Sequence, residues 1–175
     1  MKKLFLGMVF ILLDISVTAG PAKIGLLPDF AGCILMLKGL EEMKDRSGRL
    51  QKARFWVILT AVLSGIGYIL DLFSLPVQWE FRVWLLDVGV TALGIAVHYL
   101  IVRGIEELEH REGRQLQALR LKSYWLYWAV LDGICQLCSW IPVVNTGAAA
   151  AALIMGICFL AAFYRSRKLL EDDRN

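Results

Sequence analysis

The chain has 175 residues, of which 58% are hydrophobic, and its mean hydropathy is +0.58. A soluble globular domain is about 45–50% apolar, so this composition leaves little room for a soluble domain and indicates one polytopic membrane domain. The net charge is +3 and the basic residues are interleaved with acidic ones, a pattern that gives no indication of a nucleic-acid partner.

Six apolar runs follow one another along the chain, at about residues 4–18, 24–37, 55–75, 81–102, 124–141 and 143–164. Most of these runs reach the ~17–25 residues that a membrane-spanning helix needs. We therefore predict an all-α membrane protein with six transmembrane helices. A short turn that contains a proline joins the two helices of each pair, so we expect three antiparallel hairpins, at about residues 1–54, 55–122 and 123–175.

The first run can also be compared with a secretory signal peptide. A basic start and an apolar core precede Val17-Thr18-Ala19, which resembles a cleavage site with small residues. We expect the segment to be retained, because the second run needs the first as its hairpin partner. Asp14 is also unfavourable in the core of a signal peptide.

The second run is unusual because it contains Pro28. A helix that begins at Pro28 has only about ten residues before Lys38, too few to span a bilayer. A helix that begins at Pro21 has Pro28 in its interior, where the missing N–H disrupts the hydrogen bonding of the backbone. Transporters use broken helices at binding sites, so Pro28, Asp29 and Gly32 are candidate functional residues. An ordinary proline kink is the alternative.

The same stretch also resembles a known group of proteins. Leu27-Pro28-Asp29-Phe30, with Gly32 and an apolar run that ends in Gly39-Leu40, is similar to a set of small, uncharacterised multi-spanning proteins of Gram-positive bacteria. The resemblance covers about the first 55 residues. That group has no assigned activity, so the resemblance implies a lineage and no mechanism.

A short motif closes the second, fourth and sixth runs at intervals of 65 residues. Lys38-Gly39-Leu40-Glu41-Glu42 matches Arg103-Gly104-Ile105-Glu106-Glu107, and Lys168-Leu169-Leu170-Glu171-Asp172 is a weaker copy. The spacing predicts three copies of one helical hairpin. Apolar residues at helical spacing continue into the charged stretches, which are either amphipathic helical extensions or solvated linkers.

Acidic residues lie within or between the apolar runs, where an ionisable group costs at least ~2.5–3.5 kcal/mol and is by default a functional-site hypothesis. Asp14 and Asp29 are nearly equidistant from Pro21, which suggests a pair of carboxylates at similar depth in the first hairpin. Asp87 and Asp132 belong to the second and third hairpins. Asp14, Asp87 and Asp132 either face an internal polar cavity or are buried, neutral and hydrogen-bonded to neighbouring helices. Asp29 alternatively adds a favourable charge to a helix N-terminus.

The fifth and sixth runs carry two further signals. Cys135 and Cys138 form a CxxC near the outer face, the position that quinone-linked thiol oxidoreductases use, although i and i+3 cysteines also suit simple helix packing. Small residues recur every four positions at Ala148, Ala152 and Gly156, which predicts close helix packing, either within the chain or between copies. His98, near the end of the fourth run, is expected to be a satisfied interfacial histidine.

Charge placement predicts the orientation. Seventeen of the 19 Lys and Arg residues lie before the first run, after the last run, or in the stretches 38–54 and 103–122, and only Lys23 and Arg82 lie in the alternate loops. The positive-inside rule then places both termini in the cytoplasm. We expect the protein to lie in the plasma membrane.

Three functions are open at this stage. The first is transport or binding of a small cation or protonatable solute by Asp14, Asp29, Asp87 and Asp132, with Pro28 and Gly32 shaping the path. The second is a non-catalytic scaffold or regulatory subunit that binds a membrane protein or a second copy of the chain through its small-residue faces. The third is a thiol oxidoreductase that uses Cys135 and Cys138. No catalytic, cofactor-binding or metal-binding signature is present in the sequence, which favours a protein that is not an enzyme.

Overall fold

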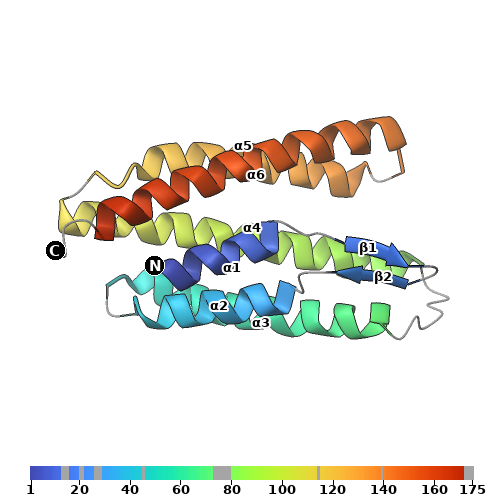
Figure 1. Cartoon of the computed structure of the whole chain (residues 1–175), viewed down its shortest axis with the longest axis horizontal. Coiled ribbons are helices and arrows are strands. Elements are labelled where there is room, and N and C mark those ends of the chain that lie inside the picture. The colour runs from blue at the N-terminus through green and yellow to red at the C-terminus, as the bar shows by residue number, and fades with distance from the viewer. Residues whose placement is uncertain are drawn as a thin grey trace.

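A computed structural model describes residues 1–12, 16–19, 22–25, 29–44, 46–72, 80–113, 115–138 and 140–171 (Figure 1). Over these residues the chain forms six α-helices and one small antiparallel sheet. The elements in chain order are α1 (Lys2–Leu12), β1 (Ser16–Ala19), β2 (Ala22–Gly25), α2 (Asp29–Glu41), α3 (Gly48–Leu72), α4 (Glu80–Glu112), α5 (Ala118–Leu137) and α6 (Pro142–Glu171). The prediction of a six-helix fold is confirmed.

The helices pack in chain order around a central core. Each helix contacts the next one, and α1 also contacts α6, so the six helices form a closed ring. The N-terminus, the end of α6 and the connections after α2 and α4 lie at one end of the bundle, and the β1–β2 hairpin lies at the other (Figure 1). We call these the charged end (residues 1–3, 38–54, 103–122 and 165–171) and the hairpin end.

The first hairpin differs from the prediction. The first run was expected to be helical over about residues 4–18, but α1 ends at Leu12 and residues 16–19 form β1. β1 pairs with β2 from Ser16↔Gly25 to Ala19↔Ala22, a register that leaves the Gly-Pro dipeptide at positions 20 and 21 to join the strands. Val17, Thr18 and Ile24 are β-branched and favour strands, and Gly and Pro favour tight turns.

The second helix begins at the later of the two predicted positions. α2 starts at Asp29, directly after Pro28, and β2 occupies residues 22–25. α1 and α2 therefore have 11 and 13 residues. At 1.5 Å per residue, each is about 16–20 Å long, which is shorter than the ~30 Å hydrocarbon core of a bilayer.

The expectation of six membrane-spanning helices is therefore met only in part. Among the described residues, three segments are long and apolar enough to cross a membrane, Gly48–Ile69, Val88–Glu112 and Pro142–Leu170, from α3, α4 and α6. α5 is 20 residues long but carries Arg120, Lys122 and Asp132, which reduce its apolar character. Three such helices indicate a membrane protein.

The buried apolar side chains gather in the half of the bundle next to the charged end. This core includes Leu4 of α1, Met36 of α2, Leu50 of α3, Ile101 of α4 and Phe163 of α6, all fully buried. The charged stretches contribute to it: in 38–54 and 103–122, nine of the ten apolar residues are buried, and Leu119 is exposed. Of the two alternatives for these stretches, this burial favours amphipathic helical extensions over solvated linkers. The nine are Leu40, Met43, Leu50, Ala53, Ile105, Leu108, Leu116, Ala118 and Leu121.

In the other half of the bundle, large apolar side chains lie on the outer surface. Large apolar side chains are exposed there on every long helix, and they include Ile66 of α3, Leu85 of α4, Val130 of α5 and Ile154 of α6. Many large apolar side chains exposed on the outside are unfavourable in water and favourable against lipid tails. The exposed surface and the three candidate spans therefore agree on a membrane environment for this half.

Candidate functional site

The structure describes the predicted site residues to different extents. Asp14 and Pro28 lie outside the described residues. Asp29 is the first residue of α2 and is half-buried, and Asp132 is half-buried in α5. Asp87 belongs to α4, but the placement of its side chain is not described. The predicted convergence of the four aspartates on one cavity therefore stays a prediction.

One hydrogen bond fixes the relative depth of α4 and α5. The side-chain amide of Gln136 donates to the hydroxyl of Thr91 at 2.8 Å. Asp87 lies one turn from Thr91 toward the hairpin end, and Asp132 lies one turn from Gln136 toward the charged end. At 1.5 Å per residue, the two aspartate backbones are about 12 Å apart along the bundle axis. Asp132 is thus the deeper of the two acidic positions.

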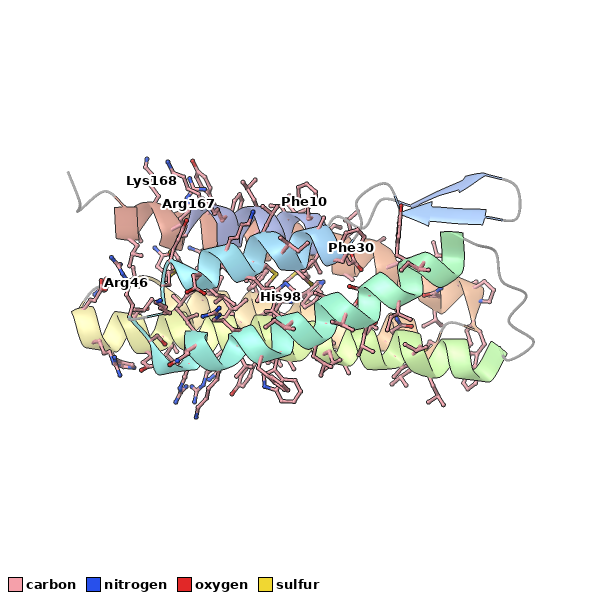
Figure 2. All side chains as sticks on the ribbon, turned by 90° about the horizontal axis from the view of Figure 1, so that it is seen from below. Phe10, Phe30, Arg46, His98, Arg167 and Lys168 are labelled. Atoms are coloured by element: carbon pink, nitrogen blue, oxygen red, sulfur yellow. The ribbon has the colours of Figure 1, made fainter. Side chains whose placement is uncertain are left out.

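His98 lies at the inner limit of this polar region, in the middle of the bundle (Figure 2). Its side chain has no exposed surface, and its ring contacts those of Trp128 and Phe159 at centroid distances of 5.2 and 6.1 Å. Nδ1 lies 2.7 Å from the carbonyl oxygen of Gly94. A carbonyl only accepts, so Nδ1 carries the proton, and Nε2 has no hydrogen-bond partner among the described residues. The prediction of an interfacial histidine is wrong, because α4 turns this position toward α5 and α6.

Polar and small side chains continue the inner faces of the helices from the core toward the hairpin end. Thr60 is buried and bonds to the Trp56 carbonyl, and Ser64 lies one turn beyond it on α3. Thr91 shares a face of α4 with His98, and Asn145 shares a face of α6 with Ala148 and Ala152. Hydroxyl and amide side chains therefore lie along α3, α4 and α6 in the half of the bundle toward the hairpin end.

Some glycines lie at close contacts between helices, and others have open space beside them. A Cβ atom built on Gly7 of α1 would lie 2.5 Å from the Gly32 carbonyl oxygen, and one on Gly39 would lie 2.5 Å from the Leu4 backbone nitrogen. These glycines let α1 and α2 approach closely, so the structure gives Gly32 a packing contact with the first helix. Glycines of the hairpin half have nothing within 4 Å of such an atom; they are Gly65, Gly67, Gly89, Gly94, Gly133 and Gly147. The same holds for Gly48 and Gly113 at the charged end, so the close approach is specific to the glycines between α1 and α2 and to Gly104, which contacts Leu50.

The structure also describes the CxxC cysteines and the small residues of α6 that the sequence singled out. Cys135 and Cys138 lie at the end of α5, and both are free thiols. Ala148, Ala152 and Gly156 are buried within the chain, where Gly156 faces the indole of Trp128. Among the described residues, no group of three or more His, Cys, Asp and Glu side chains could hold a metal ion.

Two features of this site were missed by sequence reasoning. The buried position of His98 and the Gln136–Thr91 contact both depend on how α4 and α5 pack, and the sequence carries no motif for either. Comparisons of the chain with protein families, with curated proteins and with solved structures gave no match.

Proposed function

We propose that this protein is a multi-pass protein of the plasma membrane that binds and transports a small cation or protonatable solute. In this proposal six segments cross the bilayer as three repeated hairpins, with both termini in the cytoplasm. α3, α4 and α6 supply continuous spans, and α5 crosses with Asp132 directed to the interior. α1 with β1, and β2 with α2, supply two broken crossings beside them.

The broken crossings are long enough for this role. α1 contributes about 16 Å and β1 about 13 Å, at 1.5 and 3.3 Å per residue. Backbone that is not helical is tolerated at membrane depth where it is buried in protein or lines a water-filled cavity. β2 contacts α3, which supports a position of this sheet beside the polar part of the bundle.

The proposal rests on the closed core near the charged end together with the hydroxyl-bearing residues and Asp132 that lie beyond it. Toward the cytoplasm, the ring is filled by fully buried side chains such as Met36, Ile101 and Phe159. Toward the hairpin end, the inner faces present Thr60, Ser64 and Thr91. A solute that enters from the hairpin end would meet polar groups first and a closed floor second, the arrangement expected of an alternating-access protein in one of its two states.

Asp132 and His98 are the residues that we assign to the solute. By the register that the Gln136–Thr91 bond sets, Asp132 is level with Ile95, one turn from His98. An acidic side chain at this depth is most stable when it is paired with a cation or a proton. Nε2 of His98, the nitrogen with the lone pair, is the second group that could accept a proton there.

The proposal is tested by solute flux into proteoliposomes that contain the purified chain. Monovalent cations, divalent cations and protonated amines are screened with a pH-sensitive dye inside the vesicles. Asp132→Asn should abolish flux and keep the helix content measured by circular dichroism. Glu112→Gln, which also removes one carboxylate but at the charged end, should leave flux unchanged. Equal flux in wild-type protein, Asp132→Asn and empty vesicles for every solute class would exclude the proposal.

Of the two other functions, the structure weakens the support for the scaffold alone. The scaffold hypothesis depended on a small-residue face of the sixth helix, and Ala148, Ala152 and Gly156 of that face are used inside the chain. The redox function stays an alternative, because two free thiols at Cys135 and Cys138 are the reduced state of a CxxC. Solute binding is therefore the function that the geometry supports best.

A further inference from the structure

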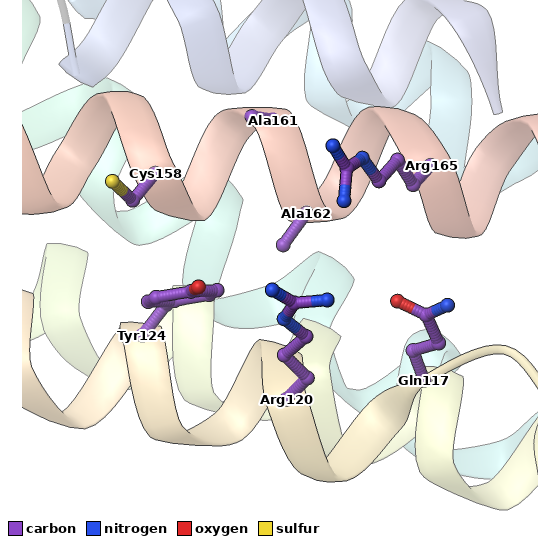
Figure 3. Close-up of a pocket in the computed structure, with 7 residues that line it drawn as sticks. All are labelled: Gln117, Arg120, Tyr124, Cys158, Ala161, Ala162 and Arg165. Carbon is purple, nitrogen blue, oxygen red and sulfur yellow. The ribbon is translucent and has the colours of Figure 1, made fainter.

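A second site lies at the charged end, on the outside of the bundle between α5 and α6. It is a pocket of about 200 Å³. Its lining is Gln117, Arg120, Tyr124, Cys158, Ala161, Ala162 and Arg165. Figure 3 shows that the guanidinium groups of Arg120, from α5, and Arg165, from α6, extend toward the same space. The solute proposed above would not reach this pocket, so the two sites are independent.

The two arginines give the pocket an uncompensated positive charge. Among the described residues, neither guanidinium has a carboxylate within 4.0 Å, whereas arginines elsewhere at this end form ion pairs, such as Arg54 with Glu41 and Arg111 with Glu107. Arg120 lies over the ring of Tyr124, with its central carbon 5.8 Å from the ring centroid, which helps to hold that side chain in place. Two like charges from different helices in one pocket are stabilised by an anion between them.

The backbone beside the pocket is held in an unfavourable conformation. Gln117, at the start of α5, has φ 60° and ψ 34°, and it is the only residue besides glycine with positive φ among the described residues. Its neighbours are fixed on both sides: the Leu116 carbonyl accepts from the Ser166 hydroxyl, and the Ala118 N–H donates to the Glu109 carboxylate at 2.8 Å. A residue held in this region costs about 1–3 kcal/mol, and such residues cluster at ligand sites.

The side chain of Gln117 is free to serve a ligand, because it makes no cap hydrogen bond to α5. The pocket thus combines two guanidinium forks with an amide donor. Guanidinium groups bind phosphate oxygens through paired N–H donors, so this set suits a tetrahedral anion with several acceptor oxygens.

The rest of the lining is apolar and continues toward the hairpin end. Cys158, Ala161 and Ala162 form the α6 side of the pocket, and exposed Ile154 lies one turn beyond them on the same face. A phosphate at the arginines would therefore have apolar helix surface beside it on the membrane side. Basic pockets between transmembrane helices on the cytoplasmic side bind the head groups of anionic lipids.

We propose that the pocket between α5 and α6 binds a phosphate group through Arg120, Arg165 and Gln117. The phosphate belongs either to an anionic phospholipid of the cytoplasmic leaflet or to a free phosphate compound. Both have the same chemistry at the arginines, and only the lipid also uses the apolar surface.

The test is a lipid titration of the full chain in neutral detergent, read as the midpoint of thermal unfolding. The probes are phosphatidylglycerol, phosphatidylcholine and inorganic phosphate. Phosphatidylglycerol should raise the midpoint of wild-type protein more than phosphatidylcholine, because the arginines repel the choline cation. Arg120→Gln with Arg165→Gln should weaken the apparent affinity by about tenfold or more. The control is Lys38→Gln with Lys52→Gln, which removes two exposed charges of α2 and α3, away from the pocket, and should bind like wild type.

Each outcome has a definite reading. A response to phosphatidylglycerol alone identifies the lipid, and an equal response to inorganic phosphate identifies a free anion at the same site. A wild-type response that the arginine pair leaves unchanged, or no response to either probe, overturns the proposal. If the double variant does not fold, Arg165→Gln alone keeps the contact of Arg120 with Tyr124, and an affinity unchanged in that variant is equally decisive.

Discussion

The hydroxyl of Ser47 donates a 2.7 Å hydrogen bond to the carboxylate of Glu107, a residue 60 positions later in the chain. The same carboxylate accepts from the backbone N–H of Arg49, so Glu107 caps the start of α3 from the end of α4. Glu42, at the equivalent position of the predicted motif, binds Lys3 at the start of α1. In both hairpins, the second glutamate of the motif therefore links the end of one helix to the start of its partner helix.

Glu107→Ala should destabilise the protein by about 1–2 kcal/mol, because it removes a helix cap and leaves the buried Ser47 hydroxyl without this acceptor. The matched control is Glu106→Ala, whose carboxylate pairs with Arg103 on its own helix and with no other cation among the described residues, so it should cost about 0.2–0.5 kcal/mol. Thermal unfolding in detergent measures both variants. Equal losses in the two would show that the cap is not what Glu107 contributes.

The pH dependence of stability should include a contribution from Glu42. The hydrogen bond from Lys3, 2.6 Å away, lowers the pKa of this carboxyl below its ordinary value of 4.5. A lowered folded-state pKa means that the contribution is fully present above pH 4.5 and is lost as the pH falls through the folded value. Glu42→Gln should therefore be less stable than wild type at pH 7, by under about 1 kcal/mol for so exposed a pair. The difference between the two unfolding midpoints should disappear in acid; a constant difference at every pH would contradict this.

Gly39→Ala should separate α1 from α2. The added Cβ would lie 2.5 Å from the Leu4 backbone nitrogen and 2.8 Å from its Cα, and backbone atoms cannot move aside as a side chain can. We expect a loss of about 1–3 kcal/mol. Gly65→Ala is the same chemical change where nothing lies within 4 Å, so it should be neutral or stabilise α3 by up to about 1 kcal/mol. Denaturation of the two variants side by side gives the comparison, and similar stabilities would rule out the close approach.

The Gln136–Thr91 hydrogen bond should be measurable as a coupling between α4 and α5. In a double-mutant cycle, Thr91→Val and Gln136→Leu should couple by about 0.6 kcal/mol and at most about 1.7, the range for hydrogen bonds between membrane helices. Thr146→Val with Gln136→Leu is the control, because the Thr146 hydroxyl bonds to the Pro142 carbonyl of its own helix. A coupling no larger than that of the control would show that the two helices do not meet at this register.

Much of the architecture was predictable because it depends on the hydropathy of short segments of the chain. Apolar runs of sufficient length predict helices wherever they occur. For the charged stretches, apolar residues at helical spacing made helical extensions one of two alternatives, and the structure buries Leu50 and Ile105 there. The secondary structure of the first hairpin was harder to predict, because an apolar run of this composition can form either a strand or a helix. The β-branched residues 17, 18 and 24 around Gly20-Pro21 decided in favour of a short sheet, and α2 then began only at Asp29.

The candidate sites were less predictable, because they depend on side chains from different helices. The sequence drew attention to Asp132 and to the CxxC, but it gave no reason to place His98 against Trp128 and Phe159. The phosphate pocket brings together Arg120 and Arg165. In the sequence, these two residues are only part of the charge bias that predicts orientation.

The sequence by itself determined that the chain has six helices, an apolar half suited to lipid and a charged end, because hydropathy and charge act residue by residue. Only the tertiary structure decided that α1 closes a ring with α6, that His98 is buried, and that two arginines from α5 and α6 share one pocket. The physical reason is that these relationships are set by the packing of segments far apart in the chain. That packing depends on where glycines such as Gly7 and Gly39 let backbones approach, and no local pattern records which helix will lie opposite.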